Sequence, residues 1–304
     1  MNTIGILKEK SNDKRVCLLP EAVQKLSNQG VTVFFESHTG EGIGVLNVDY
    51  QKAGAVCTTA EKIYEEADLI CSIGHKYNGE KLGKSPSFIG IFNPLFHKKE
   101  LFKYSDPASL YSLDLLPRST IAQRMDVLSS MASLAGYKAI LLATNHYQDA
   151  VPMFTTAAGT IKPARVLILG AGVAGLQAIA TAKRLGAMVE AFDVRSSAAE
   201  EVRSLGAKFI EVEGFTESKD AGGYAVTQTE EFQQKQQQLI HEHALQADIV
   251  ICTANIPGRK APILLKEATV LEMKKGSVIV DLASEQGGNC ELTSDNKITH
   301  HNGV

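Results

Sequence analysis

The run RVLILGAGVAGLQAIATAKRLGAMVEAFDV, residues 165–194, constrains the fold more than any other part of the 304-residue sequence. A short apolar run leads directly into Gly170-x-Gly172-x-x-Gly175, and a helical pattern and a second apolar run follow. The second run ends at Asp193, about 20 residues beyond the glycines. A lone GxGxxG motif is weak, but strand, glycines, helix and acidic strand end together are typical of a Rossmann βαβ unit that binds a dinucleotide.

Each of these residues has a separate physical role in such a site. Gly170 allows a tight turn, Gly172 lets the backbone approach a pyrophosphate, and Gly175 lets helix and strand pack closely. The helix N-terminus offers N–H groups and a positive dipole end to the phosphates. Asp193 can accept hydrogen bonds from the adenosine ribose hydroxyls and would repel a 2′-phosphate, which favours NAD over NADP. Arg195 leaves an alternative open, because an arginine there could receive that phosphate.

Two other interpretations of the glycine motif stay open at this point. A βα turn of the same sequence can be purely structural and hold no ligand. S-adenosylmethionine sites also combine a glycine-rich turn with an acidic strand end.

Short apolar runs alternate with helical patterns along the chain, which predicts an α/β fold with parallel sheets. Strands are expected at 3–7, 31–37, 68–74, 87–93, 109–115, 164–170, 188–194, 207–212, 248–254 and 277–283. Helices are expected at 20–30, 48–54, 59–67, 97–105, 121–147, 173–186, 197–206 and 264–274, and the glutamine-rich run 227–238 is expected to be a polar helix face. We therefore expect two Rossmann-like, doubly wound parallel-sheet domains with a cleft between them, residues 1–126 and 127–304, the second entered through a linking helix.

Composition excludes several classes of function. A net charge of −3 gives no basic field for nucleic acid. The N-terminus turns charged after seven residues, which leaves no signal-peptide core, and glycines interrupt the apolar run 166–182, which argues against a membrane segment. The histidines form no metal-ligand pattern, and His241 and His243 are expected on a solvated helix. Five scattered cysteines without a CxxC pair indicate reduced, mostly buried thiols in a cytoplasmic protein: Cys17, Cys57, Cys71, Cys252 and Cys290.

A second candidate site is PRSTIAQRMD, residues 117–126, which precedes a helix of small residues. Gln123 and Asp126 are three residues apart, so a helix start would place them on one face. Thr120 and Gln123 also fit a capping box, and Asp126 would be a favourable charge near a helix N-terminus. Arg118 fits either a surface position or a site. From the residues alone, the stretch is either a charged helix entrance or a binding site.

Taken together, these stretches resemble the NAD-binding component of proton-translocating NAD(P) transhydrogenases, the soluble N-terminal part of the alpha subunit, and alanine dehydrogenases are related to it. The matching runs are KEKSNDKRVCLLPEAV, PRSTIAQRMDVLSSMASLAGYKA, VLILGAGVAGLQAIATAKRLGAMVEAFDVR, DAGGYA, TANIPGRKAPILL and GSVIVDLASEQGGNCE. They extend over nearly the whole chain. The R-x₄-Q-x₂-D loop together with the GGYA loop makes the resemblance specific, because alanine dehydrogenases share the glycine motif without that combination.

The resemblance implies a set of site residues. Arg118, Gln123 and Asp126 would act in catalysis by surrounding the nicotinamide of NAD(H), with Gln123 where the NAD and NADP rings meet. A loop with Gly223 and Tyr224 would close over the cofactor, although an ordinary glycine turn with a packed tyrosine fits it too. The residues implied to contact NAD(H) are Gln123, Arg124, Met125, Asp126, Gly170, Gly172, Val173, Gly175, Asp193, Val194, Arg195, Gly223, Tyr224, Ala254 and Pro257.

Two further loops, 256–258 and 284–289, follow strand ends and are expected to line the crevice. Asp281, at the end of the strand before the second loop, is either part of the site or a buried, hydrogen-bonded structural carboxylate.

The departures from alanine dehydrogenase bear on the reaction. The positions of its substrate lysine and catalytic histidine match Ser72 and Asn93 here, while Arg15 is shared by both families and does not discriminate. An amino-acid dehydrogenase must move a proton as well as a hydride, whereas transfer between two nicotinamides needs no general base. The resemblance therefore favours hydride transfer from NADH to NADP⁺ over an alanine dehydrogenase-like reaction or a non-catalytic NAD-binding module.

The resemblance also implies an assembly. The partners would be an NADP(H)-binding component and a membrane component that couples transfer to proton translocation, in a Re/Si-specific transhydrogenase. The chain would form a homodimer on the cytoplasmic side, peripheral to the inner membrane, and bind no metal and no nucleic acid. The family continues beyond the position of Val304 with a strand and helices that return to the first domain, so we expect that segment to be missing here.

Overall fold

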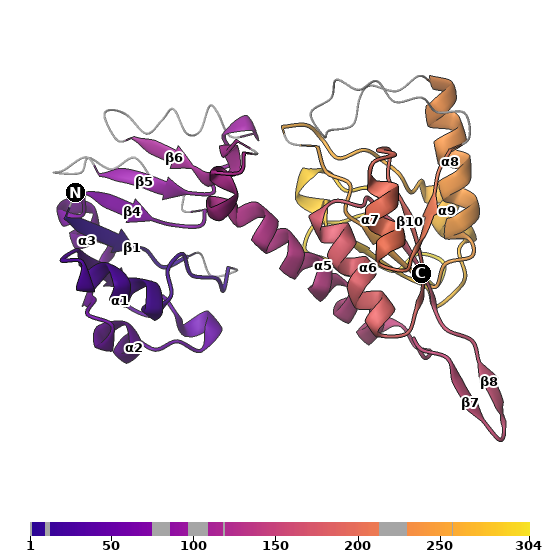
Figure 1. Ribbon diagram of the computed structural model, residues 1–304, viewed down its shortest axis with the longest axis horizontal. Helices are drawn as coiled ribbons and strands as arrows, with labels where there is room; N and C mark the ends of the chain where they lie inside the picture. Colours follow the sequence, from indigo (N-terminus) through magenta and orange to yellow (C-terminus); the bar gives the residue numbers. More distant parts are fainter. Residues whose placement is uncertain are drawn as a thin grey trace. The chain divides into compact units, whose positions relative to one another are not determined.

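A computed structural model of the protein describes residues 2–9, 13–74, 86–96, 109–117, 119–212, 230–256 and 258–304. The chain divides into two compact units, Met1–Leu128 and Ser129–Val304. Each unit has its own parallel β-sheet with helices on it (Figure 1). The predicted α/β class with two Rossmann-like halves is confirmed.

The first unit is built on a six-stranded sheet in the order β3-β2-β1-β4-β5-β6. Its strands are β1 Thr3–Ile6, β2 Thr32–Glu36, β3 Val56–Thr58, β4 Leu69–Cys71, β5 Ser87–Gly90 and β6 Leu110–Ser112, and all five pairings are parallel. Its helices are α1 Pro20–Asn28, α2 Asn47–Lys52 and α3 Ala60–Glu66. Phe34 and Phe35 point to opposite faces of β2 and enter separate cores, the first with Ile63 of α3 and the second with Tyr50 of α2.

The second unit is built on a five-stranded sheet in the order β11-β10-β9-β12-β13. Its strands are β9 Arg165–Leu169, β10 Met188–Phe192, β11 Lys208–Ile210, β12 Ile249–Cys252 and β13 Val278–Asp281. Its helices are α5 Val127–His146, α6 Val173–Arg184, α7 Ala198–Ser204, α8 Glu230–Ala244 and α9 Glu267–Glu272. One apolar core joins α5, α6 and α7 to one face of the sheet, and a second core joins α8 and α9 to the other.

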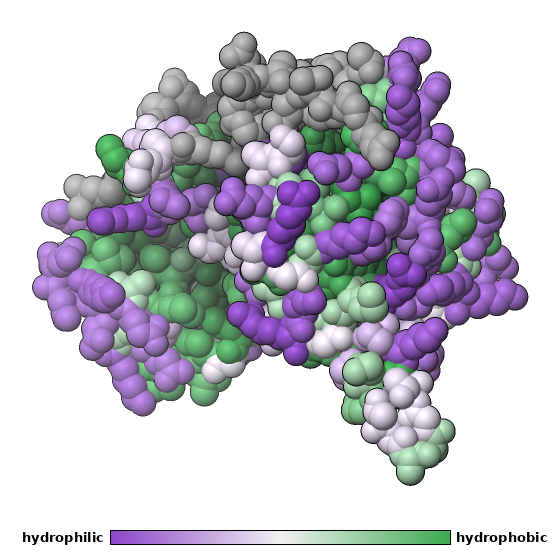
Figure 2. Space-filling model, turned by 45° about the vertical axis from the view of Figure 1, so that its right-hand side comes forward, coloured by the Kyte–Doolittle hydropathy of each residue, from purple (hydrophilic) through white to green (hydrophobic). Residues whose placement is uncertain are grey.

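Three strands were not predicted from the sequence. β3 has three residues at the edge of its sheet, and two of them are half-buried. β7 Phe154–Thr156 and β8 Gly159–Ile161 form an antiparallel hairpin that projects from the second unit, with every strand residue exposed (Figure 1). Figure 2 shows pale and partly hydrophobic residues on this hairpin. The exposed hairpin strands lack the apolar alternation from which a strand is predicted, and β3 lies in the short segment between the expected helices 48–54 and 59–67.

In both sheets, an aspartate joins the starts of the two central strands by the same pair of hydrogen bonds. Asp248 donates its N–H to the carbonyl of Arg165 at 2.8 Å, and its Oδ2 accepts the Arg165 N–H at 2.7 Å. Asp68 does the same with Thr3, at 3.0 and 3.1 Å. Each aspartate precedes the strand at which the chain crosses to the other side of its sheet. The two halves therefore share this detail as well as their winding.

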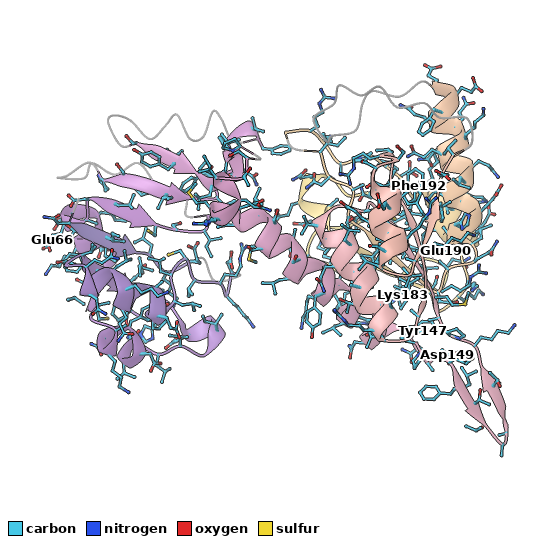
Figure 3. All side chains as sticks on the ribbon, viewed as in Figure 1. Glu66, Tyr147, Asp149, Lys183, Glu190 and Phe192 are labelled. Atoms are coloured by element: carbon cyan, nitrogen blue, oxygen red, sulfur yellow. The ribbon has the colours of Figure 1, made fainter. Side chains whose placement is uncertain are left out.

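The prediction that His241 and His243 lie on a solvated helix face is wrong. His243 Nδ1 lies 2.7 Å from Glu190 Oε2 on β10, and both side chains are 19% exposed. Glu190 and Phe192 share one face of β10 (both labelled in Figure 3), and Phe192 belongs to the core that contains Ile240 of α8. His241 Nδ1 lies 3.0 Å from Thr269 Oγ1. The glutamine-rich helix therefore covers the sheet; His243 binds it to β10, and His241 binds it to α9.

α5 has the length and apolar composition of a helix that could cross a membrane, and it is the one such helix among the residues described. The same properties fit a helix that packs in a core, and α5 buries Gly136, Ala139, Ile140 and Ala143. A Cβ on Gly136 would lie 2.0 Å from the carbonyl oxygen of Ala174 at the start of α6. Only a glycine permits this close approach of the two helices.

Substituting Gly136→Ala is expected to lower the free energy of unfolding by about 1–3 kcal/mol, because the methyl group would meet backbone that cannot rotate away. Chemical denaturation checks this. Leu134→Ala on the same helix is the control; Leu134 is 59% exposed, so its truncation should change stability little. Equal, small effects of both substitutions would contradict the close approach.

The free energy of unfolding should also decrease at acidic pH because of Glu190. Burial raises the pKa of Glu190, but hydrogen bonds from His243 and Lys208 outweigh burial and hold the pKa below its ordinary value. The folded protein therefore binds this proton less readily than the unfolded chain, and the stabilisation is lost as pH falls through the folded pKa. Glu190→Gln is expected to cost about 1–2 kcal/mol at pH 7.

The difference between Glu190→Gln and wild type should shrink as pH falls from about 5 to about 3. Urea unfolding at several pH values measures it, with Glu200→Gln at an exposed position of α7 as the control. A difference that is constant over this range would show that the carboxylate charge does not contribute.

Candidate functional site

The glycine loop lies where the second sheet reverses its strand order. From β9 the chain winds through β10 and β11 on one side and then crosses to β12 and β13 on the other. Ligands of doubly wound sheets bind at this place, outside the carboxyl ends of the strands. Gly170 follows β9 with φ of 103°, and its carbonyl accepts a hydrogen bond from Thr253 Oγ1 at 2.8 Å, just after β12. The loop is thus anchored to both strands that border the reversal.

The three glycines of the motif differ in what surrounds them. A Cβ on Gly175 would lie 1.9 Å from the carbonyl oxygen of Gly170, so only glycine lets α6 sit this close to the end of β9. A Cβ on Gly172 would meet nothing within 4 Å. Gly172 is exposed and forms the N-cap of α6, whose first N–H groups have no partners within the helix. The structure thus has the tight turn and the close packing that were predicted, and an open backbone at the helix N-terminus.

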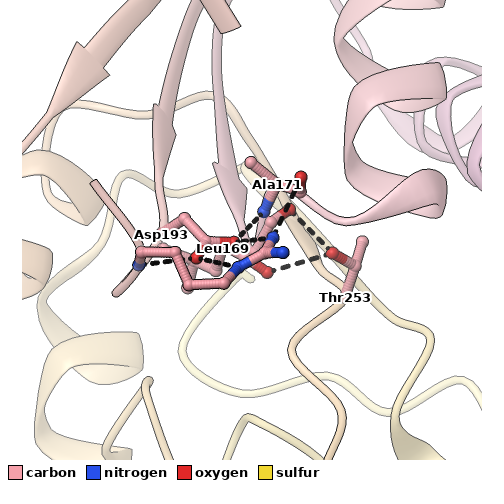
Figure 4. A network of polar contacts seen from close by, with 6 residues as sticks. Leu169, Ala171, Asp193 and Thr253 are labelled. Carbon is pink, nitrogen blue, oxygen red and sulfur yellow. Dashed lines mark hydrogen bonds and ion pairs between the residues drawn. The ribbon is translucent and has the colours of Figure 1, made fainter. Parts of the chain in front are cut away.

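Asp193 connects this loop to the end of β10 (Figure 4). Its Oδ2 accepts the N–H of Ala171 at 2.7 Å, and its Oδ1 accepts the N–H of Arg195 at 2.9 Å. The Arg195 guanidinium binds both oxygens, with Nε 2.9 Å from Oδ1 and Nη2 3.0 Å from Oδ2. The Asp193 side chain is 8% exposed and that of Arg195 is 29% exposed. The ribose-binding role of Asp193 stays a prediction; its role in holding the loop is visible.

Asn289 ends the loop 284–289 that was expected to line the crevice, and its contacts were not predicted from the sequence. It is fully buried, and its Nδ2 donates to the carbonyls of Ala254 and Pro262, both at 2.8 Å. Its Oδ1 accepts the N–H of Ala254 at 3.0 Å. Asn289 therefore fixes the segment that follows β12. The only sequence hint is its position after two glycines, Gly287 and Gly288, which have φ of 100° and 80°.

Of the two roles considered for Asp281, the structural one is seen. Its Oδ2 accepts hydrogen bonds from the N–H of Asn289 at 2.7 Å and from Thr293 Oγ1 at 2.6 Å, while Oδ1 accepts the N–H of Ala283 at 2.9 Å. It thereby shapes the loop 284–289. Beside it, burial raises the pKa of Cys252 well above its ordinary value, so this thiol stays protonated and is a poor nucleophile.

The predicted continuous helix over 121–147 is wrong at its start. A 3-10 turn spans Ala122–Met125, Asp126 has φ −76° and ψ 83°, and α5 begins at Val127. This ψ lies outside the helical region, so Gln123 and Asp126 do not share an α-helix face. Gln123, Arg124 and Met125 are exposed, and Asp126 is half-buried.

The capping box expected from Thr120 and Gln123 does not form. The N–H of Gln123 donates to the carbonyl of Ser119 at 3.0 Å, and Ser119 Oγ accepts the N–H of Ala122 at 3.3 Å. The Ser119 hydroxyl therefore caps the 3-10 turn, and the Gln123 side chain takes no part in capping.

The other predicted site residues are placed as follows. Val173 is exposed in the first turn of α6, Val194 is half-buried after β10, and Ala254 is half-buried after β12. Arg118, Gly223, Tyr224 and Pro257 lie outside the described residues, as does the expected helix 97–105. Within the described ranges, no cluster of three or more histidine, cysteine, aspartate or glutamate side chains could hold a metal ion.

At the carboxyl edge of the first sheet, Ser72 is buried after β4, and Asn93 has φ of 49° after β5. Arg15 forms a two-pronged ion pair with Asp13, with Nε 2.9 Å from Oδ1 and Nη2 2.6 Å from Oδ2. The Arg15 guanidinium is therefore paired with a carboxylate two residues away in the sequence.

Comparison with known proteins assigns the family. Residues 5–135 match the model described as alanine dehydrogenase/PNT, N-terminal domain, and residues 139–304 match alanine dehydrogenase/PNT, C-terminal domain. The chain belongs to the alanine dehydrogenase/PNT family. It is 42% identical over 315 residues to an NAD(P) transhydrogenase alpha-subunit protein of Rhodospirillum rubrum, covering 99% of this chain and 82% of that protein.

A solved structure of transhydrogenase from Sinorhizobium meliloti matches with a TM-score of 0.88 at 42% identity, over 99% of this chain and 84% of that one. Alanine dehydrogenase of Mycobacterium tuberculosis is 28% identical over 303 residues, covering 94% of this chain and 73% of that protein. The resemblance to transhydrogenases is confirmed, with alanine dehydrogenase as a more distant relative.

The open position of Gly172 leads to a test of the dinucleotide site. Gly172→Ala is expected to leave stability nearly unchanged, because its φ of −76° suits alanine and the added methyl group meets no atom. It should weaken NADH binding roughly tenfold or more, because the methyl group stands where a pyrophosphate must approach. Titration of NADH fluorescence and thermal unfolding measure the two effects.

Gly175→Ala is the matched substitution, and it should lower the unfolding temperature because its methyl group would overlap the carbonyl of Gly170. If Gly172→Ala binds NADH as tightly as wild type, the pyrophosphate does not lie against Gly172.

Proposed function

We propose that this chain is the NAD(H)-binding component of an NAD(P) transhydrogenase, which passes a hydride from NADH to NADP⁺ held by a partner component. The observation that carries the proposal is the 42% identity to a transhydrogenase alpha subunit over 99% of the chain. The site geometry is consistent with it, since Gly172 and the first turn of α6 offer N–H groups to a pyrophosphate at the reversal of the strand order.

The proposed roles divide between the two ends of the cofactor. Gly172 and the α6 N-terminus bind the pyrophosphate, and Asp193 binds the adenosine ribose. Arg118, Gln123 and Asp126 hold the nicotinamide ring, and the loop with Gly223 and Tyr224 covers it. Exposure of Gln123 supports this proposal, because a side chain that meets a second nicotinamide must be accessible to the partner.

In this proposal, catalysis depends on the relative position of the two nicotinamide rings. A hydride moves directly between the C4 atoms of two nicotinamide rings, so NADH becomes NAD⁺, NADP⁺ becomes NADPH, and no proton needs a general base. Catalysis then consists of holding two rings at near-contact distance with water excluded. The residues at the positions of the alanine dehydrogenase lysine and histidine, Ser72 and Asn93, support this assignment over amino-acid oxidation, because neither side chain can serve as the acid/base that such a reaction requires.

The proposed assembly follows from the same assignment. NADP(H) is bound by the partner component, and a membrane component couples Re/Si-specific transfer to proton translocation. The chain acts as a homodimer, peripheral to the inner membrane on its cytoplasmic side, with residues 1–126 and 127–304 as its two domains. The relatives named as subunits of a transhydrogenase support the need for other components.

The test combines the purified chain with an NADP-binding component and follows NADH-dependent reduction of an NADP analogue by absorbance. Transfer is expected only with both proteins present. Gln123→Ala should lower the transfer rate at least tenfold with unfolding temperature unchanged, because Gln123 is exposed and makes no capping contact. Lys138→Gln, at an exposed position of α5, is the control.

The same chain is assayed alone with NADH, pyruvate and ammonium. Turnover in that assay, or transfer unaffected by Gln123→Ala, would contradict the proposal.

A further inference from the structure

The carboxylate of Asp193 already has as many donors as it can accept. Oδ1 receives the backbone N–H and Nε–H of Arg195, both at 2.9 Å. Oδ2 receives the backbone N–H of Ala171 at 2.7 Å and Nη2–H of Arg195 at 3.0 Å (Figure 4). A carboxylate offers about four lone-pair positions, so all of them are in use.

The four donors are not equally replaceable. The N–H groups of Ala171 and Arg195 belong to backbone that the turn and the strand end hold in place. The guanidinium is the end of a long side chain and is 29% exposed, whereas the carboxylate is 8% exposed. Two ribose hydroxyls can therefore bind Asp193 only by replacing the Nε–H and Nη2–H groups of Arg195.

The guanidinium also changes the charge that a ligand meets. Opposite charges 2.9 Å apart largely cancel at the distance of a neighbouring group, so Asp193 paired with Arg195 repels an anion far less than Asp193 alone. When the guanidinium leaves the carboxylate, its planar fork stays within one side-chain length of the ribose and matches a phosphate.

We propose that Arg195 determines how strongly this subsite distinguishes NADH from NADPH. It offsets the charge of Asp193 and so weakens the exclusion of a 2′-phosphate that the carboxylate alone would impose. The inference rests on the proposed function, because it requires that NADH binds in the second unit with its adenosine ribose at Asp193.

The experiment measures dissociation constants of NADH and NADPH for the full chain by fluorescence titration and compares their ratio. NADH and NADPH differ only in the 2′-phosphate. A variant that is partly unfolded, or that binds both ligands more weakly, therefore keeps the same ratio of dissociation constants. R195M and R195Q, which remove the charge, are each expected to raise the preference for NADH about tenfold. R195K keeps the charge without the fork and should stay within about threefold of wild type.

The matched control is R203M on α7, where the arginine is exposed and lies 3.7 Å from Glu211. Its ratio should equal that of wild type. D193N should lower the preference for NADH, because it removes the negative charge and keeps the shape.

An unchanged or lowered ratio in R195M and R195Q, with NADH still bound, overturns the inference and leaves the proposed function intact. Absence of NADH binding by the wild-type chain overturns both. If R195M does not fold, the ratio measured for R195Q alone decides between these outcomes. The glutamine side chain is polar and can still donate a hydrogen bond to Asp193.

Discussion

The hydrogen bond from the Ala171 N–H to Asp193 determines the geometry of the second unit's site. It ties the turn after β9 to the end of β10, two strands that are neighbours in the sheet. Thr253 Oγ1 binds the same turn from the other side, through the carbonyl of Gly170. The turn is therefore held by both strands beside it, and the N-terminus of α6 is aimed before any ligand arrives. Such preorganisation lowers the cost of ordering the site on binding.

This arrangement depends on packing further away. α6 can begin at Gly172 only because Gly175 allows it to lie against the carbonyl of Gly170, and because Gly136 allows α5 to lie against Ala174. On the other side of the sheet, Asn289 and Asp281 hold the segments after β12 and β13. The loops at the strand ends are thus fixed by buried polar side chains, each with several partners. Removing one of them would leave the others unsatisfied, which costs more than the lost bond itself.

The sequence predicted what periodicity and the glycine motif encode: the parallel sheets, most helices, and the turn with Asp193 at a strand end. It did not predict the β7–β8 hairpin, whose exposed strands have no apolar period, or β3, which lies in the short segment between the expected helices 48–54 and 59–67. It also missed the break at Asp126, since the residues on both sides favour a helix, and a single ψ of 83° leaves no mark in composition. The contacts of Asn289 and His243 were not predicted, because their partners, Ala254 and Glu190, are distant in sequence.

The two aspartates of the described site each accept several hydrogen bonds from the protein itself. Asp193 binds Arg195 and Ala171, and Asp281 binds Asn289 and Thr293. These carboxylates hold the loops in place, with their lone pairs used by donors of the protein itself. An amino-acid dehydrogenase instead needs a side chain that can act as an acid/base, so full pairing would be a defect there. For the proposed transfer of a hydride between two nicotinamides it is an advantage, because a site whose polar groups are satisfied can exclude water without leaving a buried charge unpaired.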